Sequence, residues 1–269
     1  MADWPAPLDA YPPARMAQLV EDVGVRKANL PTLSTLMLGF LAGAFISFGA
    51  LFYTIVITDS TLGFGPTRLM GGLAFSLGLI LVILGGAELF TGNSLIVMAV
   101  AQRRVTLAAM LRNWGLVFVA NFAGAVAVAI AVAWAGLPGN IATTAVRIAE
   151  AKAALPLVPA LVRGVLCNVL VCLAVWLCFS ARSATDKVMV IPLPIAAFVA
   201  LGFEHSIANM FFLPLGMLLG SGAIGIEGLL RNLVPVTLGN IVGGGVLVGG
   251  VYWAIYLRGT PTAPPSAPR

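Results

Sequence analysis

The chain has 269 residues, of which 60% are hydrophobic and only 9% are charged, and its mean hydropathy is +1.02. A soluble domain usually carries about 25% charged residues, so this composition excludes an ordinary water-soluble globule and predicts a bundle of membrane helices. The net charge is +5, but the basic residues stand at the ends of apolar runs, which indicates membrane topology and not a nucleic-acid partner. The three cysteines share one apolar run and form no CxxC motif, so no metal site is expected.

The two ends of the sequence are predicted to lie outside the membrane-spanning part. Residues 1–13 contain four prolines and no apolar run, unlike a cleaved signal peptide. From residue 14 to residue 28, apolar side chains recur with helical spacing opposite polar ones, which indicates an amphipathic helix on the membrane surface. The predicted organisation is an N-terminal segment (1–28), a six-helix transmembrane domain (29–258) and a disordered Pro-rich tail (259–269).

Charged or turn-forming residues bracket six long apolar runs. The second run would be about 51 Å long as one straight helix, whereas the hydrocarbon core of a bilayer is about 30 Å thick. The fifth run is longer still and is punctuated by Pro192, Pro194 and Pro214. We therefore expect each of these two runs to hold one helix that is broken near its centre. The bracketing residues are Lys27 and Asp59, Arg68 and Arg103, Arg112 and Gly136, Arg163 and Arg182, Lys187 and Glu227, and Arg231 and Arg258.

Six spans place both termini on one side of the membrane. That side collects ten of the fifteen basic residues. Because basic residues accumulate in cytoplasmic loops, both termini are expected to be cytoplasmic. The ten are Arg15, Arg26, Lys27, Arg103, Arg104, Arg112, Arg182, Lys187, Arg258 and Arg269, and the others are Arg68, Arg147, Lys152, Arg163 and Arg231.

The two halves of the sequence repeat each other. Each half holds three of the predicted spans, an odd number, so the second half enters the membrane from the opposite side. We therefore expect a 3+3 inverted repeat, in which interrupted helices at matching positions mark the functional site. The matching pairs are Glu88 with Glu204 and Asn93 with Asn209, 116 residues apart, and Asn113 with Asn232, Asn121 with Asn240, Gly124 with Gly243 and Trp134 with Trp253, 119 residues apart.

The two predicted breaks imply the same chemistry. Irregular backbone at membrane depth is tolerated only where it is buried in protein or lines a cavity. A half-helix that begins there directs free N–H groups and the positive end of its dipole toward the membrane centre, which favours an anion. We expect Thr91 or Asn93 to cap the half-helix after the first break, and Ser206 or Asn209 to cap the one after the second.

Several polar residues near the breaks are functional candidates. His205 is the single histidine and lies within the second break, where it is either a functional ionisable group or a hydrogen-bonded core residue. Asn168 lies in the middle of the fourth span and is expected to bond to a break or to His205, because an unpaired buried amide is costly. Glu88 and Glu204 are expected mainly to accept hydrogen bonds from loop N–H groups and so to hold the breaks in shape.

Charged and bulky residues around the breaks have two readings each. Lys27 and Lys152 lie just outside spans on opposite sides, where they are either solvated loop charges or attract anions into a vestibule. Bulky apolar residues near the breaks either pack the core or form constrictions that resist hydrated ions. These are Phe75, Leu79, Phe90 and Phe198.

Four stretches carry long motifs, namely GGLAFSLGLILVILGGAELFTGN (71–93), CNVLVCLAVW (167–176), GFEHSIANMFFLPLG (202–216) and LVPVTLGNIVGGGVLVGGVYWAIYL (233–257). In them the chain resembles the formate/nitrite transporter family, and most closely its bacterial formate channel branch. The similarity runs from about residue 15 to residue 258. The Thr91-Gly92-Asn93 triplet is nearer to the nitrite-type members, which keeps nitrite open as a substrate.

The resemblance implies an all-α, aquaporin-like membrane protein with broken second and fifth helices, assembled as a homopentamer in the bacterial inner membrane. It implies that His205 is the central histidine, Thr91 the loop threonine, Asn168 the partner asparagine and Asn209 the asparagine that follows the histidine. It further implies vestibule lysines, slit-lining apolar residues and supporting polar residues. The lysines are Lys27 and Lys152, the slit residues are Phe75, Leu79, Leu89, Phe90, Val171 and Phe198, and the supporting residues are Glu88, Asn93 and Glu204.

The expected function is transport of a small monovalent anion, formate first, with nitrite and then hydrosulfide as alternatives. Lysines would gather the anion, Thr91 and the half-helix ends would hold it, and His205 would hydrogen-bond or protonate it. No enzymatic activity and no cofactor are expected, and an anchor subunit of a membrane enzyme is the alternative from another class. A water or glycerol pore is disfavoured because no Asn-Pro-Ala triplets stand at the breaks.

Overall fold

The structure is a computed structural model that describes residues 10–222 and 224–259, and within these ranges it consists of helices and loops without strands. The predicted disordered tail, from residue 260 on, lies outside the described residues. Five helical stretches are long and apolar enough to cross a membrane. They are α2 (Thr32–Ile57), α3 (Phe64–Leu84), α6 (Leu107–Ala135), α8 (Leu157–Ser180) and the continuous stretch of α12 (Ile226–Ile241), the π-helix η2 (Val242–Gly250) and α13 (Val251–Tyr256).

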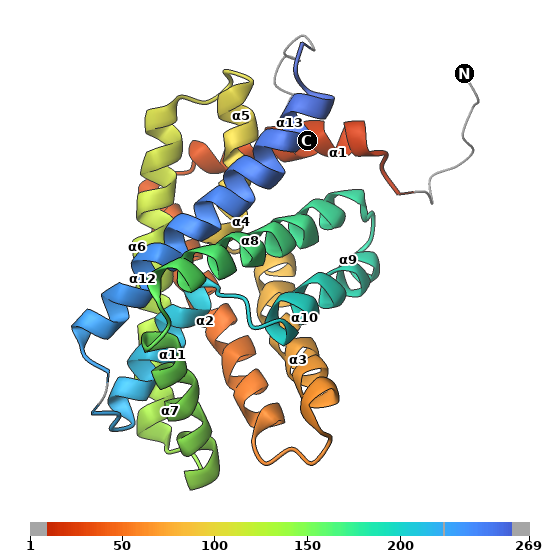
Figure 1. Ribbon diagram of the computed structural model, residues 1–269. Helices are drawn as coiled ribbons and strands as arrows, with labels where there is room; N and C mark the ends of the chain where they lie inside the picture. Colours follow the sequence, from red (N-terminus) through yellow and green to blue (C-terminus); the bar gives the residue numbers. More distant parts are fainter. Residues whose placement is uncertain (1–9, 223, 260–269) are drawn as a thin grey trace.

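Shorter helices complete the bundle (Figure 1). Among them α10 packs against α3, and α11 packs against α6 and α7. At one end of the bundle α1 packs against α13, so both ends of the described chain lie there. The shorter helices are α1 (Pro13–Ala28), α4 (Phe90–Asn93), η1 (Ser94–Ile96), α5 (Val97–Ala101), α7 (Gly139–Ala153), α9 (Ala184–Val190), α10 (Pro192–Ala200) and α11 (Ser206–Leu218).

Two short interruptions separate helices that follow each other in the chain. Residues 85–89, here named break 1, separate α3 from α4, and residues 201–205, named break 2, separate α10 from α11. Each break turns at a glycine with a positive φ angle, +74° at Gly86 and +73° at Gly202. Because side chains with a Cβ atom rarely adopt this conformation, both turns depend on glycine.

Two pairs of long helices approach each other closely at matching glycines. Helix α2 packs along α6, and α8 packs along α12 and η2. A Cβ atom at Gly124 of α6 would overlap the carbonyl oxygen of Phe40, and one at Gly243 of η2 would overlap that of Val165. Small residues allow this close backbone approach, so the repeat seen in the sequence extends to how the helices pack.

The predicted amphipathic helix is present as α1, but protein covers its apolar face. Met16 and Val20 are buried and belong to one cluster with Leu95 of η1. The polar side is anchored as well, because Arg104 Nη1 lies 3.1 Å from Glu21 Oε1. The position of α1 at the membrane surface stays a prediction. The periodicity shows that one face is buried, and it does not show whether lipid or protein buries it.

Candidate functional site

His205 and Thr91 meet between the two breaks. His205 Nε2 lies 3.0 Å from Thr91 Oγ1, although the residues are 114 positions apart in the chain. Both side chains are buried, with 2% and 0% of their surface exposed. His205 is the last residue of break 2, and Thr91 lies in α4 directly after break 1. The structure therefore joins two candidates that the sequence supplies separately.

The hydrogen bonds of His205 define its tautomer. Its Nδ1 accepts a hydrogen bond from the backbone N–H of Ala208 at 3.1 Å. A backbone N–H can only donate, so Nδ1 is unprotonated and the neutral ring carries its proton on Nε2. Nε2–H then donates to Thr91 Oγ1, which leaves the hydroxyl hydrogen of Thr91 for another acceptor. A proton on Nδ1 would break the Ala208 bond and place positive charge at the positive end of the α11 dipole.

His205 also caps α11, a role that the sequence analysis gave to other residues. The bond from Ala208 N–H is an N-cap bond. Leu89 stands at the equivalent place before α4, and its side chain makes no capping bond. The predicted caps are wrong because those side chains lie within the first turns of the two helices and not before them. They are Thr91 and Asn93 in α4, and Ser206 and Asn209 in α11.

Two side chains of α8 hold the carbonyl group of Thr91. Asn168 Nδ2 donates to Thr91 O at 3.2 Å and to Asn240 O at 2.6 Å, so it bonds to the short helix that directly follows break 1. One turn further along α8, Cys172 Sγ donates to the same Thr91 oxygen at 3.4 Å. The sequence motifs gave Cys172 no role, and its spacing of one helical turn from Asn168 was the available signal.

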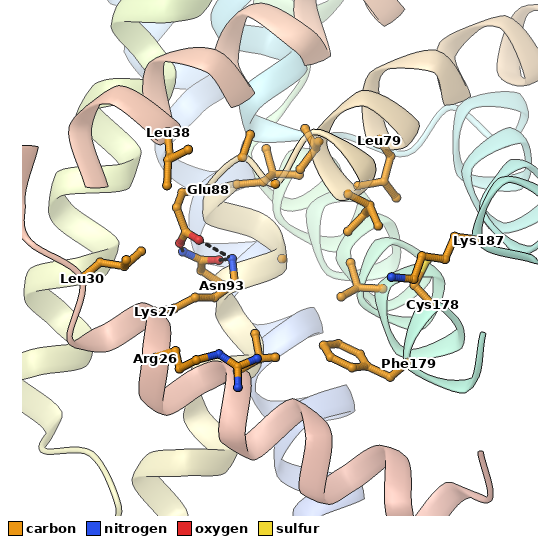
Figure 2. A pocket seen from close by; sticks show the side chains of 18 residues that line it. Arg26, Lys27, Leu30, Leu38, Leu79, Glu88, Asn93, Cys178, Phe179 and Lys187 are labelled. Carbon is orange, nitrogen blue, oxygen red and sulfur yellow. Dashed lines mark hydrogen bonds and ion pairs between the residues drawn. The ribbon is translucent and has the colours of Figure 1, made fainter. Parts of the chain in front are cut away.

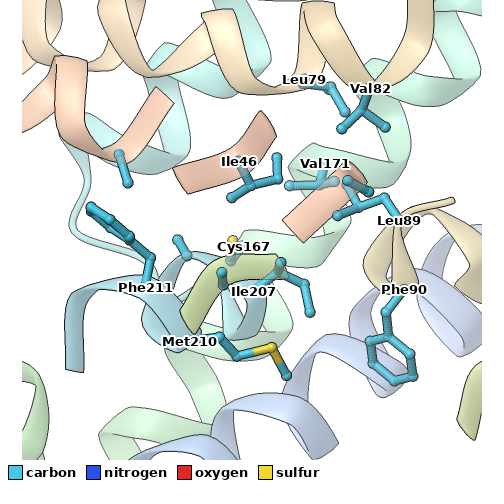
Figure 3. Close-up of a cluster of buried hydrophobic side chains, with 14 of the residues drawn as sticks. Ile46, Leu79, Val82, Leu89, Phe90, Cys167, Val171, Ile207, Met210 and Phe211 are labelled. Carbon is cyan, nitrogen blue, oxygen red and sulfur yellow. The ribbon is translucent and has the colours of Figure 1, made fainter. Parts of the chain in front are cut away.

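Apolar side chains flank the His205–Thr91 pair. The Phe198 ring stacks on the His205 ring, with centroids 5.9 Å apart, and packs edge-on against Phe75 at 5.6 Å. Three more of the predicted slit residues are 2–3% exposed and belong to the same buried cluster (Figure 3). They are Leu79, Leu89 and Val171.

Phe90 differs from the other predicted slit residues. Its ring makes edge-to-face contacts with Trp114 and Phe118 of α6, with centroids 6.0 Å and 5.1 Å apart. Figure 3 shows its side chain apart from Leu79 and Val171. These contacts anchor α4 to α6, so Phe90 acts in packing in this structure.

Two cavities reach this apolar cluster. The Lys27 cavity, of about 450 Å³, is lined by Lys27 and Leu79 (Figure 2). The Lys152 cavity, of about 220 Å³, is lined by Lys152, His205 and Phe75. Leu79 and Phe75 are one turn apart on α3 and line different cavities, so the apolar cluster lies between the two.

A closed ring of hydrogen bonds surrounds Lys27. Its Nζ lies 2.7 Å from Glu88 Oε1 and donates to Asn93 Oδ1 at 3.0 Å. Asn93 Nδ2 donates to Glu88 Oε2 at 2.7 Å and to Asn113 Oδ1 at 2.9 Å. Asn113 Nδ2 returns to the carbonyl of Lys27 at 3.0 Å. The ring joins α1 to break 1 and α6, and Figure 2 shows Glu88 and Asn93 at the wall of the Lys27 cavity.

An equivalent ring surrounds Lys152. Its Nζ donates to Glu204 Oε1 and Oε2, both at 3.0 Å. Asn209 Nδ2 donates to Glu204 and to Asn232 at 2.7 Å each, and Asn232 Nδ2 donates to the Lys152 carbonyl at 2.8 Å. The side chains of Glu88 and Glu204 thus accept from lysine and asparagine, and their predicted bonds to loop N–H groups are wrong. The rings differ at Asn209, whose buried Oδ1 has no partner among the described residues.

A second pair of asparagines ties each break to a long helix. Asn121 and Asn240 each donate to a carbonyl of a neighbouring helix and to the carbonyl of the glutamate in the break. Each also accepts the N–H of the residue two positions after that glutamate. The partners are Gly39, Glu88 and Phe90 for Asn121, and Gly164, Glu204 and Ser206 for Asn240. The sequence repeat identified both asparagines but assigned them no contacts.

Four further basic residues line the two cavities. In the sequence they served only as evidence for the membrane topology. Arg26 and Lys187 line the Lys27 cavity, and Arg68 and Arg163 line the Lys152 cavity. They come from separate helices and share no sequence pattern, so the sequence alone could not group them. Within the described residues no cluster of three or more metal-binding side chains occurs.

Apolar helices long enough to span a membrane, with a buried polar pair between two cavities, define a membrane channel or transporter. The chain belongs to the formate/nitrite transporter family, whose family model matches residues 14–254. The resemblance read from the sequence motifs is thereby confirmed.

Relatives agree with this assignment. The formate channel FocA of Escherichia coli (strain K12) is 41% identical over 275 residues, which cover 94% of this chain and 96% of FocA. A solved pentameric formate channel with formate bound matches with a TM-score of 0.78 and 41% identity, over 84% of this chain and 98% of that one. A solved FNT family ion channel matches with a TM-score of 0.83 and 30% identity, over 91% and 99%.

Proposed function

We propose that this chain is one subunit of a homopentameric channel in the bacterial inner membrane that conducts small monovalent anions, formate first. The observation that carries the proposal is the buried His205–Thr91 pair between two cavities lined by basic residues. Similarity to a formate channel and to a pentameric structure with formate bound supports it. Each subunit would hold its own pore and would carry out no enzymatic reaction and need no cofactor.

We propose six membrane spans in a 3+3 inverted repeat, formed by residues 29–258. The second span would combine α3 with α4 to α5, and the fifth would combine α10 with α11, so that each break lies inside a span. The two equivalent hydrogen-bonded rings, around Lys27 and Lys152, support the repeat. The contact between α1 and α13 supports termini on one side, and the excess of basic residues on that side favours the cytoplasm.

In the proposed mechanism the apolar cluster excludes hydrated ions, because crossing it removes their water. A small anion that enters accepts the hydroxyl hydrogen of Thr91 and replaces Thr91 Oγ1 as the acceptor of the Nε2–H of His205. The positive end of the α11 dipole stabilises its negative charge. Proton transfer from His205 requires a second proton on the ring, at Nδ1, which displaces the N–H of Ala208. Proton linkage would therefore be coupled to release of the α11 cap.

Nitrite is the second candidate substrate. It is a monovalent oxyanion of similar size, and the Thr91-Gly92-Asn93 triplet resembles nitrite-type members of the family. The test is uptake of formate, nitrite, hydrosulfide and glycerol into liposomes that contain the purified protein, at two pH values. We expect formate to enter fastest and glycerol to enter no faster than into protein-free liposomes. Rapid glycerol uptake without formate uptake would contradict the proposal.

A further inference from the structure

The Lys152 cavity holds three basic side chains and one carboxylate. The basic residues are Arg68, Lys152 and Arg163, and the carboxylate is Glu204. Lys152 Nζ lies 3.0 Å from both carboxylate oxygens of Glu204, so these two charges offset each other. Among the described residues neither arginine forms an ion pair. The net positive charge of this cavity therefore belongs to the arginines and not to the lysine.

The Lys152–Glu204 pair has a structural explanation. The Lys27–Glu88 pair occupies the equivalent place at break 1, and in both rings the lysine carbonyl is bound by an asparagine. Because the same pair recurs at both breaks, its role is structural: it ties each break to the neighbouring helix that carries the lysine. Since the glutamate offsets the positive charge of the lysine, the pair attracts an anion only weakly.

Arg68 extends from α3 onto break 2. Its Nε donates to the carbonyl of Ala200, the last residue of α10, at 3.0 Å. A Cβ atom at Gly202 would lie only 2.9 Å from Arg68 Nη2, so the guanidinium rests on the turn of the break. With Nε engaged, the two terminal NH₂ groups are the remaining donors of Arg68, and Tyr53, which lines the same cavity, interacts with its guanidinium. A guanidinium offers these donors in a planar fork that matches a carboxylate.

Arg163 brings a second charge to the same break. Its carbonyl accepts the backbone N–H of Glu204 at 3.2 Å, whereas its side chain is exposed and lines the cavity. At break 1 the equivalent bond runs from Glu88 to the carbonyl of Leu38. The break therefore does not require an arginine at this position, and the side chain of Arg163 is available for another role.

We propose that Arg68 and Arg163, together with Tyr53, form an anion-binding site at the mouth of the Lys152 cavity that takes small monocarboxylates. The site concentrates the anion beside His205, as a positively charged cleft does for any oppositely charged solute. The inference rests on the proposed function, because it assumes that anions pass through this cavity.

The test is the initial rate of formate uptake into proteoliposomes, measured against formate concentration and ionic strength. We expect the double variant Arg68→Gln/Arg163→Gln to raise the half-saturating formate concentration about tenfold and to flatten the salt dependence. The double lysine variant keeps both charges and should restore the salt dependence. Arg231→Gln is the matched control, because it removes one charge from an exposed residue that lines neither cavity.

An assembled double variant with unchanged half-saturating concentration and unchanged salt dependence would overturn the inference. If Arg68→Gln does not assemble, because its Nε holds Ala200, then Arg163→Glu decides. Its charge reversal should raise the half-saturating concentration, and wild-type behaviour would contradict the site. Wild-type protein that takes up nitrite but no formate would contradict the proposed substrate alone, and the same variants would then decide the inference with nitrite.

Discussion

Break 1 and break 2 share a scaffold but differ in the residues at its centre. Both turn at a glycine with positive φ, and both are held by a lysine–glutamate pair and by asparagines. At the place of His205 in break 2, break 1 has Leu89, and at the place of Thr91 after break 1, break 2 is followed by Ile207. The matched residues build the two breaks, and the unmatched residues make the polar pair between them.

The two cavities also combine residues that match between the halves of the repeat with residues that do not. Lys27 and Lys152 are paired with glutamates in equivalent rings, whereas the additional basic residues occupy unrelated positions. Figure 2 shows Lys187 at the side of the Lys27 cavity opposite Lys27. Both cavities thus carry similar positive charge from residues at positions that are not equivalent in the repeat. This is expected where the charge of a cavity, and not the exact position of each charged residue, is needed.

The largest effect is expected where the scaffold is matched. Asn121→Leu and Asn240→Leu each remove the partner of three buried backbone groups: the carbonyl of the glutamate in the break, one carbonyl of a neighbouring helix, and the first N–H of the helix after the break. Since each such group costs about 1–3 kcal/mol, both variants should lose several kcal/mol and assemble poorly. Thermal unfolding of the purified oligomer in detergent measures this, with Asn140→Leu at an exposed site as control. Wild-type stability in one of the two variants would show that the breaks are not held alike.

A smaller effect, on formate uptake, is expected at the His205–Thr91 pair, whose residues are not repeated in the other half of the chain. Of two equivalent substitutions, only the one at this pair should lower uptake. Thr91→Val keeps the shape of the side chain but removes the acceptor of His205 Nε2–H, so formate uptake should fall about tenfold. Thr91→Ser retains the hydroxyl and should recover most of the rate. Ile207→Val changes the equivalent residue after break 2 and should have little effect. Equal losses in Thr91→Val and Ile207→Val would mean that Thr91 acts only through packing.

The smallest effect on formate uptake is expected at Cys172, which bonds to the carbonyl of Thr91. Cys172→Ala removes the thiol that donates to the Thr91 carbonyl, and uptake should fall about twofold, in keeping with a weak hydrogen bond. Cys172→Ser keeps a donor at this place and should behave as wild type. Cys167→Ala is the control, because Cys167 is equally buried on α8 and is not bonded to Thr91. Identical rates for the alanine and serine variants would exclude this positioning role.

Much of the architecture could be predicted, because apolar run length, glycine and proline report local structure. The sequence also named His205 and Thr91, but their contact depends on how chain segments 114 residues apart come together. The caps were mispredicted because Ser, Thr and Asn are preferred at N-caps in general, whereas the position of the turn decides which residue precedes α11. The bonds of Glu88 and Glu204 could not be foreseen, since their lysine partners come from α1 and α7.

The central claim is that break 2 contributes a titratable hydrogen-bond donor, His205, to the anion path. The most direct test is the pH dependence of formate uptake by wild type and by His205→Asn in the same liposomes. Asparagine can cap α11 and donate a hydrogen bond, but it does not titrate. The account predicts a pentameric variant that still conducts formate and has lost the pH dependence contributed by His205. A variant with the wild-type rate and the wild-type pH profile would contradict it.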